Sequence, residues 1–462
     1  MPRIYLMFAA GLLLFGCATR PAPAPSPVSA RPQLAIVGVT VIPMSGKQDS
    51  LPGRTVIIRD GRIQAIGPTA RVKPPAGARI IDGRGRFLMP ALTDAHVHLE
   101  YSEDPNLLKL FVANGVTTVR SMDGRPYLLD WRERVRTGAL VGPRIVTAGP
   151  IIDGSPPARP DNLAVADPAA ARAAVAEQGG AGYDFIKLYL NLSPEAYEAA
   201  VDEARRRGLR VAGHVPRGVS LAQAVQGQWS IEHLGDFAAS ISVDGATVPG
   251  WIRRFLGAPI DPARLEALAT SLAAARVWVI PTSVQKDREL APSEAMNRWL
   301  AEPSIRHIPP DFLAAWRGQL ERFQARMDAD DWALVERARL NRLAVISAFH
   351  KAGVLLAVGS DTPNPFVAMG ASVHLELANF VAAGLSPRDA LMAATLNPAR
   401  MLGLEREQGS VAVGRRADLL LLSADPLMNV GNAERRVGLV LDGRWLAEEE
   451  LQSMTRALRP AA

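Results

Sequence analysis

Residues 91–99 have the sequence Ala-Leu-Thr-Asp-Ala-His-Val-His-Leu, a short apolar run that ends in ligand-type side chains. An apolar run of this length is typical of a buried strand. On a strand, side chains two residues apart point to the same side, so His96 and His98 can bind one cation together. The stretch therefore predicts a buried strand that carries part of a metal site.

Seven further apolar runs follow along the chain, most of them after an amphipathic helical stretch. They are residues 117–122, 144–151, 184–190, 210–216, 229–234, 278–284 and 354–361. Alternating strands and helices predict a parallel sheet with crossover helices. Eight such units favour an α/β fold of the (β/α)8 TIM-barrel type over residues 90–406 rather than an open sheet, because ligand-type residues gather at the strand ends.

Segments rich in β-forming residues flank this region on both sides. Residues 33–89 contain the hairpin signal Asp60-Gly61, and residues 407–449 contain Asp442-Gly443. Neither segment has enough strands to close a core alone. We therefore expect one small β-sandwich domain assembled from both chain ends, with a separate sandwich at each end as the alternative.

Ligand-type side chains recur at other predicted strand ends. The fifth strand ends in Gly-His-Val-Pro with His214, the sixth in Ile-Glu-His-Leu with His233, and the eighth in Gly-Ser-Asp with Asp361. The fourth strand contains Lys187, although only six of the 52 basic residues are lysines. Because barrel strands converge at their carboxyl ends, we expect these side chains to form one site.

The motifs Asp-Ala-His-Val-His, Asp-Phe-Ile-Lys-Leu-Tyr, Gly-His-Val-Pro, Ile-Glu-His-Leu and Val-Gly-Ser-Asp, in this order, resemble those of the amidohydrolase superfamily in its binuclear-metal form. The resemblance covers residues 34–446. It implies that two divalent metal ions, preferably zinc, are held by six residues: His96, His98, Lys187, His214, His233 and Asp361. Lys187 would bridge both ions as a carbamate derived from carbon dioxide, a reaction that arginine cannot undergo.

The resemblance also implies a mechanism. A hydroxide shared by two metal ions would attack the carbonyl carbon, and Asp361 would accept its proton and pass it to the leaving nitrogen. The motifs resemble those of imidazolonepropionase-like relatives and of secreted Xaa-Pro and Xaa-Arg dipeptidases. We therefore expect a metal-dependent amidohydrolase that cleaves an amide or peptide bond in a small molecule, namely a dipeptide or an N-acyl amino acid.

Two other functions stay open. A mononuclear deaminase or a cyclic-amide hydrolase is one, although deaminases of this type lack the bridging lysine and place a glutamate beside the fifth-strand histidine, where this chain has Val215. A catalytically silent lipoprotein that uses the barrel as a scaffold is the other, although none of the ligand positions is lost.

A dipeptide substrate requires groups that bind its C-terminal carboxylate. Arg120, Tyr189 and Arg217 follow strand ends and are candidates, and His374 occupies a position that often carries histidine in relatives. Each is also compatible with a structural role. The stretch after the third strand, Gly149 to Gly154, departs from a Gly-Gly-His sequence common in relatives, which puts dipeptide specificity in question.

The N-terminus has the order of a secretory signal peptide. Residues 1–16 contain one arginine and an apolar run too short to span a bilayer, and Leu-Phe-Gly-Cys resembles a lipoprotein signal ending at Cys17. Residues 17–32 form a spacer rich in proline and alanine. We expect an exported protein whose lipid anchor holds it in the membrane, by resemblance the bacterial outer membrane facing the periplasm. Without lipidation of Cys17 it would be periplasmic or secreted.

Two further features concern partners. The formal net charge is +6, but the basic residues are scattered among acidic ones, so we expect no nucleic-acid binding. Residues 285–349 form an unusually long aromatic-rich crossover, interpreted as a helical insertion that acts as a lid or a homo-oligomer contact. Helices packed on the side of the barrel are the alternative.

Overall fold

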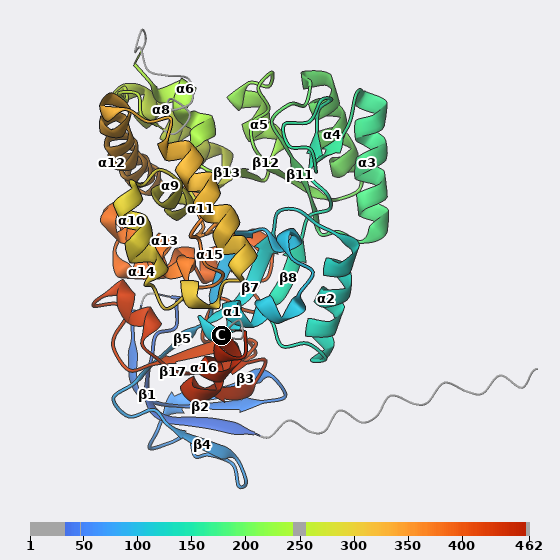
Figure 1. Cartoon of the computed structure of the whole chain (residues 1–462). Coiled ribbons are helices and arrows are strands. Elements are labelled where there is room, and N and C mark those ends of the chain that lie inside the picture. Colours follow the sequence, from blue (N-terminus) through green and yellow to red (C-terminus); the bar gives the residue numbers. More distant parts are fainter. Residues whose placement is uncertain (1–32, 47, 244–255, 459–462) are drawn as a thin grey trace, which may run out of the picture.

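The computed structural model describes residues 33–46, 48–243 and 256–458 of the chain. The predicted signal peptide, Cys17 and the spacer lie outside these residues. Within the described part of the chain, no helix combines the length and the apolar character that a membrane span requires. The structure has a β domain, at the bottom of Figure 1, and a larger region of alternating strands and helices above it.

The larger region is built on eight parallel strands, and each overlaps one of the predicted apolar runs. They are β6 (Leu92–Val97), β7 (Val116–Ser121), β8 (Arg144–Thr147), β11 (Phe185–Leu188), β12 (Arg210–Gly213), β13 (Ser230–Glu232), β14 (Trp278–Ile280) and β15 (Leu355–Leu356). Two short strands, β9 (Ile152–Asp153) and β10 (Leu163–Ala164), follow β8.

Hydrogen bonding divides these strands into a three-stranded sheet, β6-β7-β8, and a seven-stranded sheet, β10-β9-β11-β12-β13-β14-β15. Parallel bridges between Ala148 and Phe185 and between Val97 and Thr362 join the two sheets at both edges. Because both edges are joined, the eight parallel strands close into a barrel. The predicted (β/α)8 barrel is confirmed.

Helices follow the strands around the barrel. They are α1 (Leu108–Ala113), α2 (Pro126–Thr137), α3 (Pro168–Ala181), α4 (Pro194–Arg206), α5 (Leu221–Gly227), α6 (Ala238–Ile241), α8 (Pro262–Ala275), α13 (Ser372–Ala382), α14 (Pro387–Ala393) and α15 (Leu396–Leu402). Their ends follow from local chemistry. For example, the Asp167 side chain caps the first turn of α3, and Gly182 ends that helix in the left-handed conformation.

The β domain combines both ends of the chain. Its strands are β1 (Leu34–Val41), β2 (Leu51–Arg59), β3 (Arg62–Pro68), β4 (Arg79–Asp82), β5 (Phe87–Pro90), β16 (Leu419–Leu422), β17 (Arg436–Leu441) and β18 (Arg444–Ala447), followed by α16 (Glu448–Arg456). Antiparallel pairing of β5 with β16 links the two ends in one eight-stranded sheet. Side chains from both ends, among them Ile36 and Leu421, share one apolar cluster. The structure thus has one β domain that contains strands from both ends of the chain.

The connection between β14 and β15 is long and helical. It contains α9 (Ser283–Glu289), α10 (Ser293–Leu300), α11 (Pro310–Gln324) and α12 (Ala329–Ala352). Rings of Trp299 and Trp316 lie 5.3 and 5.7 Å from that of Phe366, and the Trp316 indole donates to the Pro363 carbonyl at 3.0 Å. The helices therefore pack on the loop that follows Asp361, at the carboxyl end of the barrel.

Candidate metal centre

The predicted ligands come together at the carboxyl ends of the barrel strands. His96 and His98 project from β6 with ring centroids 5.5 Å apart, and both are buried. The His96 ring lies 4.8 Å from that of His233, which stacks on His214, also at 4.8 Å. The four imidazoles thus form a continuous row from β6 to the ends of β12 and β13.

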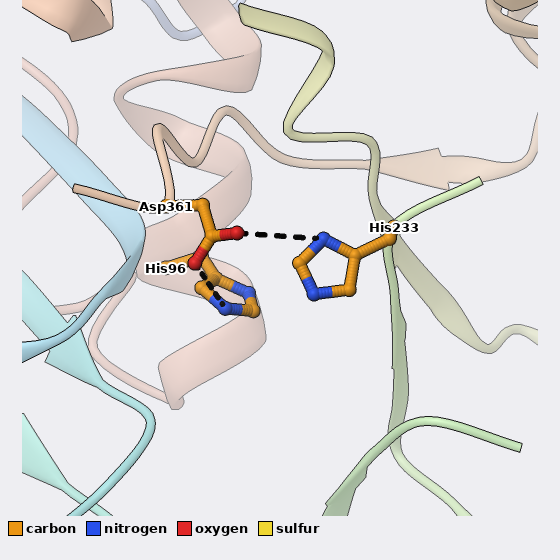
Figure 2. A group of neighbouring side chains, drawn as sticks. All are labelled: His96, His233 and Asp361. Carbon is orange, nitrogen blue, oxygen red and sulfur yellow. Dashed lines mark ion pairs between the residues drawn. The ribbon is translucent and has the colours of Figure 1, made fainter. Parts of the chain in front are cut away.

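Asp361 lies against this row. Its Oδ1 atom is 3.3 Å from His96 Nε2 and 3.2 Å from His98 Nε2, and its Oδ2 atom is 3.9 Å from His233 Nδ1. Figure 2 shows the carboxylate between the His96 and His233 rings. Ligand atoms of these three residues all lie within 4.8 Å of one another. One carboxylate therefore contacts imidazoles from both parts of the predicted ligand set.

Two of the ligands have unusual backbone conformations. His233 has φ of 67° and Asp361 has φ of 62°, both in the left-handed region, which residues other than glycine seldom adopt. Such conformations cost about 1–3 kcal/mol and persist where surrounding contacts enforce them. For Asp361 one such contact is the neighbouring Ser360, whose N–H and hydroxyl donate to Asp94 at 2.9 and 2.5 Å. These contacts hold the turn that carries Asp361 against β6.

A carboxylate orients each histidine of β6. His96 Nδ1 donates to Glu232 at 2.7 Å, and His98 Nδ1 donates to Glu100 at 2.7 Å, because a carboxylate can only accept here. Glu100 lies in the single-turn helix that follows β6 (Leu99–Tyr101). Both contacts leave the Nε2 atoms directed toward Asp361. This arrangement is typical of metal-binding histidines.

The other two histidines are also held at Nδ1. His214 Nδ1 lies 3.2 Å from the Asp236 carboxylate, which also accepts the Val215 N–H at 2.8 Å. His233 Nδ1 lies 2.6 Å from the Thr282 hydroxyl. Each contact fixes the orientation of a ring, so the row of imidazoles is preorganised.

Lys187 belongs to the same buried layer. It lies on β11 and has 1% of its surface exposed. The negative charges of Glu232 and Asp361 favour its protonated form. Burial lowers the pKa of Lys187 to about 8, although the two carboxylates oppose that change. An uncharged amine is the form that reacts with carbon dioxide, and burial favours it.

The charges of the site suit metal binding. Burial lowers the pKa of His214 and His233, which keeps both imidazoles neutral and able to bind a metal. Burial alone would raise the pKa of Asp361, but His96 and His98 hold it well below its usual value. The site therefore presents the neutral imidazoles of His214 and His233 beside an ionised carboxylate.

An observation within the site tests whether these residues fit a metal ion. His96 Nε2 and Asp361 Oδ1 are fully buried, and neither has a hydrogen-bond partner among the described residues. Buried polar atoms without a partner are costly and rare in native proteins. A divalent cation would satisfy both atoms, and imidazole with carboxylate is a suitable donor set for it. The residues present therefore fit a metal ion.

Two predicted substrate contacts are wrong. Arg120 is fully buried, and its Nη2 lies 2.7 Å from both oxygens of Glu232, so its charge is already used inside the barrel. His374 is buried in α13, and its Nε2 donates to the Asn114 carbonyl at 3.0 Å, just before the amino end of β7. It therefore lies at the opposite end of the barrel from the ligands.

The two other candidates stay predictions. The Tyr189 ring packs edge-on against His214, with centroids 4.7 Å apart. Arg217 is exposed and donates to the Asn191 side chain at 2.8 Å. Tyr189 is thus adjacent to a ligand, whereas Arg217 lies on the neighbouring loop.

Sequence reasoning missed the residues that orient the ligands. Asp94 and Glu232 belong to the motifs quoted above, which assign them no role, and Glu100 and Asp236 lie outside those motifs. The available signal was a set of acidic residues within a few positions of each histidine. Which histidine each of them contacts depends on the barrel, since His96 and Glu232 are 136 residues apart.

Comparison with known proteins agrees with this geometry. The chain matches the amidohydrolase family over residues 87–446. It is similar to 5-methylthioadenosine/S-adenosylhomocysteine deaminase of Symbiobacterium thermophilum, with 24% identity over 85% of this chain and 86% of the relative. It is also similar to imidazolonepropionase of the same organism, with 27% identity over 81% and 84% of the two chains.

Two solved structures are similar over nearly their whole length. Bottromycin amidohydrolase has a TM-score of 0.72 and 26% identity, covering 92% of this chain and 90% of that one. A protein described as a prolidase from Bifidobacterium longum has a TM-score of 0.67 and 25% identity, covering 93% and 99%. The chain belongs to the amidohydrolase family and is an enzyme of that class, which acts on carbon–nitrogen bonds.

Proposed function

We propose that the protein hydrolyses the amide or peptide bond of a dipeptide or an N-acyl amino acid at a binuclear metal centre. The observation that carries the proposal is the contact of Asp361 with His96 and His98, in which His96 Nε2 and Asp361 Oδ1 have no hydrogen-bond partner among the described residues. Lys187 lies buried in the same layer, which supports a second ion bridged to the first.

We assign the ligands to the two ions by their positions along the row of imidazoles. His96, His98 and Asp361 would hold the more buried ion. The histidines that continue the row, His214 and His233, would hold the second, and Lys187 as a carbamate would bridge both. Nitrogen ligands favour zinc, and the carboxylate and carbamate would also accept manganese, cobalt or iron.

The chain's own residues define the chemistry that the site can perform. Two divalent cations supply a nucleophile at neutral pH, because they lower the pKa of water. Asp361 would accept the proton of that water on its carboxylate and deliver it to the leaving nitrogen. Glu232 would hold His96 in a single orientation throughout, since it binds the ring nitrogen that does not face Asp361.

Deamination or opening of a cyclic amide is the second candidate function. The observation that favours it is the similarity to a deaminase and to imidazolonepropionase over most of the chain. In this chain Val215 and Pro216 follow His214, and the carboxylate near His214 is Asp236, which binds the Nδ1 atom. The buried Lys187 favours the binuclear function over this one.

Metal content is the first measurement, made on protein from residue 33 onward. We expect close to two ions per chain in the wild type and a loss in Lys187→Ala. Lys351→Ala, an exposed lysine on α12, is the matched control and should bind as many ions as the wild type. One ion or none, with no effect of Lys187→Ala, would contradict the binuclear centre.

The substrate screen follows on the metal-loaded protein. Xaa-Pro and Xaa-Arg dipeptides and N-acyl amino acids should release a free amino acid. Adenosine derivatives, tested for ammonia release, and cyclic amides represent the second candidate function. Turnover confined to those compounds would reject the peptidase proposal and favour deamination or ring opening.

We also propose that the protein is exported and anchored through lipid on Cys17. The support is the order of a basic residue, an apolar run and the Leu-Phe-Gly-Cys sequence before a proline-rich spacer. Labelled palmitate should be incorporated by the wild type and not by Cys17→Ser, and the variant should move to the soluble fraction. Equal labelling of both proteins would contradict the anchor.

A further inference from the structure

A buried carboxylate organises the loop that follows β9. Asp153, at the end of β9, is fully buried. It accepts hydrogen bonds from the Gly154 N–H at 2.9 Å, the Ala158 N–H at 2.7 Å and the Asn162 side chain at 3.0 Å. It also accepts the Asn191 N–H at 2.7 Å. The loop is therefore fixed both internally and to the segment after β11.

A close backbone approach fixes the same loop a second time. A Cβ atom at Gly154 would lie 1.8 Å from the Asn191 carbonyl oxygen, so only glycine allows this packing. The Asn191 side chain also donates to the Pro156 carbonyl at 3.0 Å. The side chains carried by residues 155–162 thus have a defined position relative to β11.

Arg159 extends from this loop to the rim of the metal centre. Its Nη2 donates to the Tyr101 hydroxyl at 2.5 Å, and its guanidinium carbon lies 5.7 Å from the centre of the Tyr101 ring. The Tyr101 ring lies 5.9 Å from that of His98, and the Tyr189 ring lies 4.7 Å from that of His214. Arg159 therefore contacts Tyr101, which packs against one end of the row of imidazoles, and Tyr189 packs against the other end.

The charge of Arg159 is only weakly compensated. The acidic group that pairs with it is Asp161, at 3.5 Å, whose side chain is 47% exposed, and an exposed pair contributes little. A partly buried guanidinium whose only ion pair among the described residues is an exposed one is suited to binding a carboxylate by two parallel hydrogen bonds.

We propose that Arg159 binds the C-terminal carboxylate of the substrate, with Tyr101 orienting its guanidinium. This inference rests on the proposed function, because only a dipeptide or an N-acyl amino acid carries that carboxylate next to the scissile bond. Arg159 thereby fills the role that the sequence had suggested for Arg120. It determines specificity, whereas the metal ligands carry the chemistry.

Binding of products separates this role from catalysis. The probes are L-proline and L-prolinamide, titrated calorimetrically into the metal-loaded protein. Arg159→Gln should weaken L-proline binding at least tenfold and leave L-prolinamide binding unchanged. Arg159→Lys should retain part of the affinity, because it keeps the charge without the planar fork. Equal binding of L-proline by the wild type and Arg159→Gln, or no binding by the wild type, would overturn the inference.

Hydrolysis of L-alanyl-L-proline and its C-terminal amide gives the second readout. The wild type should prefer the free acid at least tenfold in kcat/KM, and Arg159→Gln should lose this preference mainly through a higher KM. Arg172→Gln, a partly exposed arginine on α3, is the control. If Arg159→Gln still prefers the free acid, the inference about Arg159 is overturned and the proposed function is not. Absence of hydrolysis of any peptide or N-acyl substrate would instead reject the proposed function.

Discussion

Arg120 and Glu232 form a salt bridge in which neither side chain is exposed, with Arg120 Nη2 2.7 Å from both carboxylate oxygens. Arg120 also donates to the Ala95 carbonyl at 2.6 Å and to the Ser230 hydroxyl at 2.9 Å. Glu232 in turn accepts from His96. The barrel interior thus contains a polar network that connects β6, β7 and β13 and orients the first metal ligand.

Arg120→Met should destabilise the protein strongly. Glu232 would remain buried without its cation, and breaking one partner of a buried pair costs about 3–5 kcal/mol. Denaturant-induced unfolding of the metal-free protein measures this loss. Arg136→Met, which breaks an exposed pair with Glu133, should cost no more than about 1 kcal/mol. Similar losses for both variants would show that the buried pair has no special role.

Glu232→Gln should weaken metal binding. The amide has the shape of the carboxylate but lacks its charge, so it orients and polarises His96 less well. Loss of such a ligand-orienting partner lowers metal affinity about 10- to 100-fold. Competition with a chelator and elemental analysis measure the affinity. Glu266→Gln, an exposed residue of α8, is the control, and equal affinities in the two variants would contradict the prediction.

Gly154→Ala should impair catalysis more than stability. The added methyl group would collide with the Asn191 carbonyl and displace the loop that carries Arg159. Misplacement of a binding group by about 1 Å can reduce the rate about 100-fold, so we expect kcat/KM to fall at least about tenfold. Gly180→Ala has open space around it on α3 and should leave kcat/KM unchanged. Unaltered kcat/KM in Gly154→Ala would show that the loop does not position the substrate.

His374 should make stability depend on pH. Burial lowers the pKa of this imidazole to about 4, from 6.5 for an unperturbed histidine. Between these values the unfolded chain binds a proton at this residue and the folded chain does not. The free energy of unfolding therefore falls as the pH decreases from about 6.5 to about 4, by at most about 3 kcal/mol from this residue.

The variant His374→Gln isolates this contribution. Its amide N–H can still donate to the Asn114 carbonyl, but it does not titrate. The loss of unfolding free energy between pH 7.5 and 4.5 should be about 2–3 kcal/mol smaller than in the wild type. Identical pH dependence of the two proteins would show that His374 is not responsible.

The barrel and the positions of its ligands could be predicted from the sequence because both depend on local patterns. Apolar runs that alternate with helical stretches specify strands and crossovers, and parallel strands in a barrel bring their carboxyl ends together. His96, His214 and Asp361 each follow such a run directly. These side chains therefore lie in one site because of the order of the strands along the chain.

The partners of these ligands depend on tertiary structure. Arg120 and Glu232 are 112 residues apart, and the sequence does not record which strand ends face each other or how deeply each side chain is buried. For this reason Arg120 was predicted to contact substrate, although the interior of the barrel pairs it with an acid.

The sequence likewise does not show at which end of the barrel a side chain lies. His374 lies in a helix after the last strand, and only packing shows that it faces the amino end of β7. Arg159 lies in a loop without strand or helix pattern, and a buried carboxylate together with a close backbone contact brings it to the metal centre. Local periodicity determined the fold and the ligands, whereas burial and long-range packing decided which charged groups remain available to a substrate.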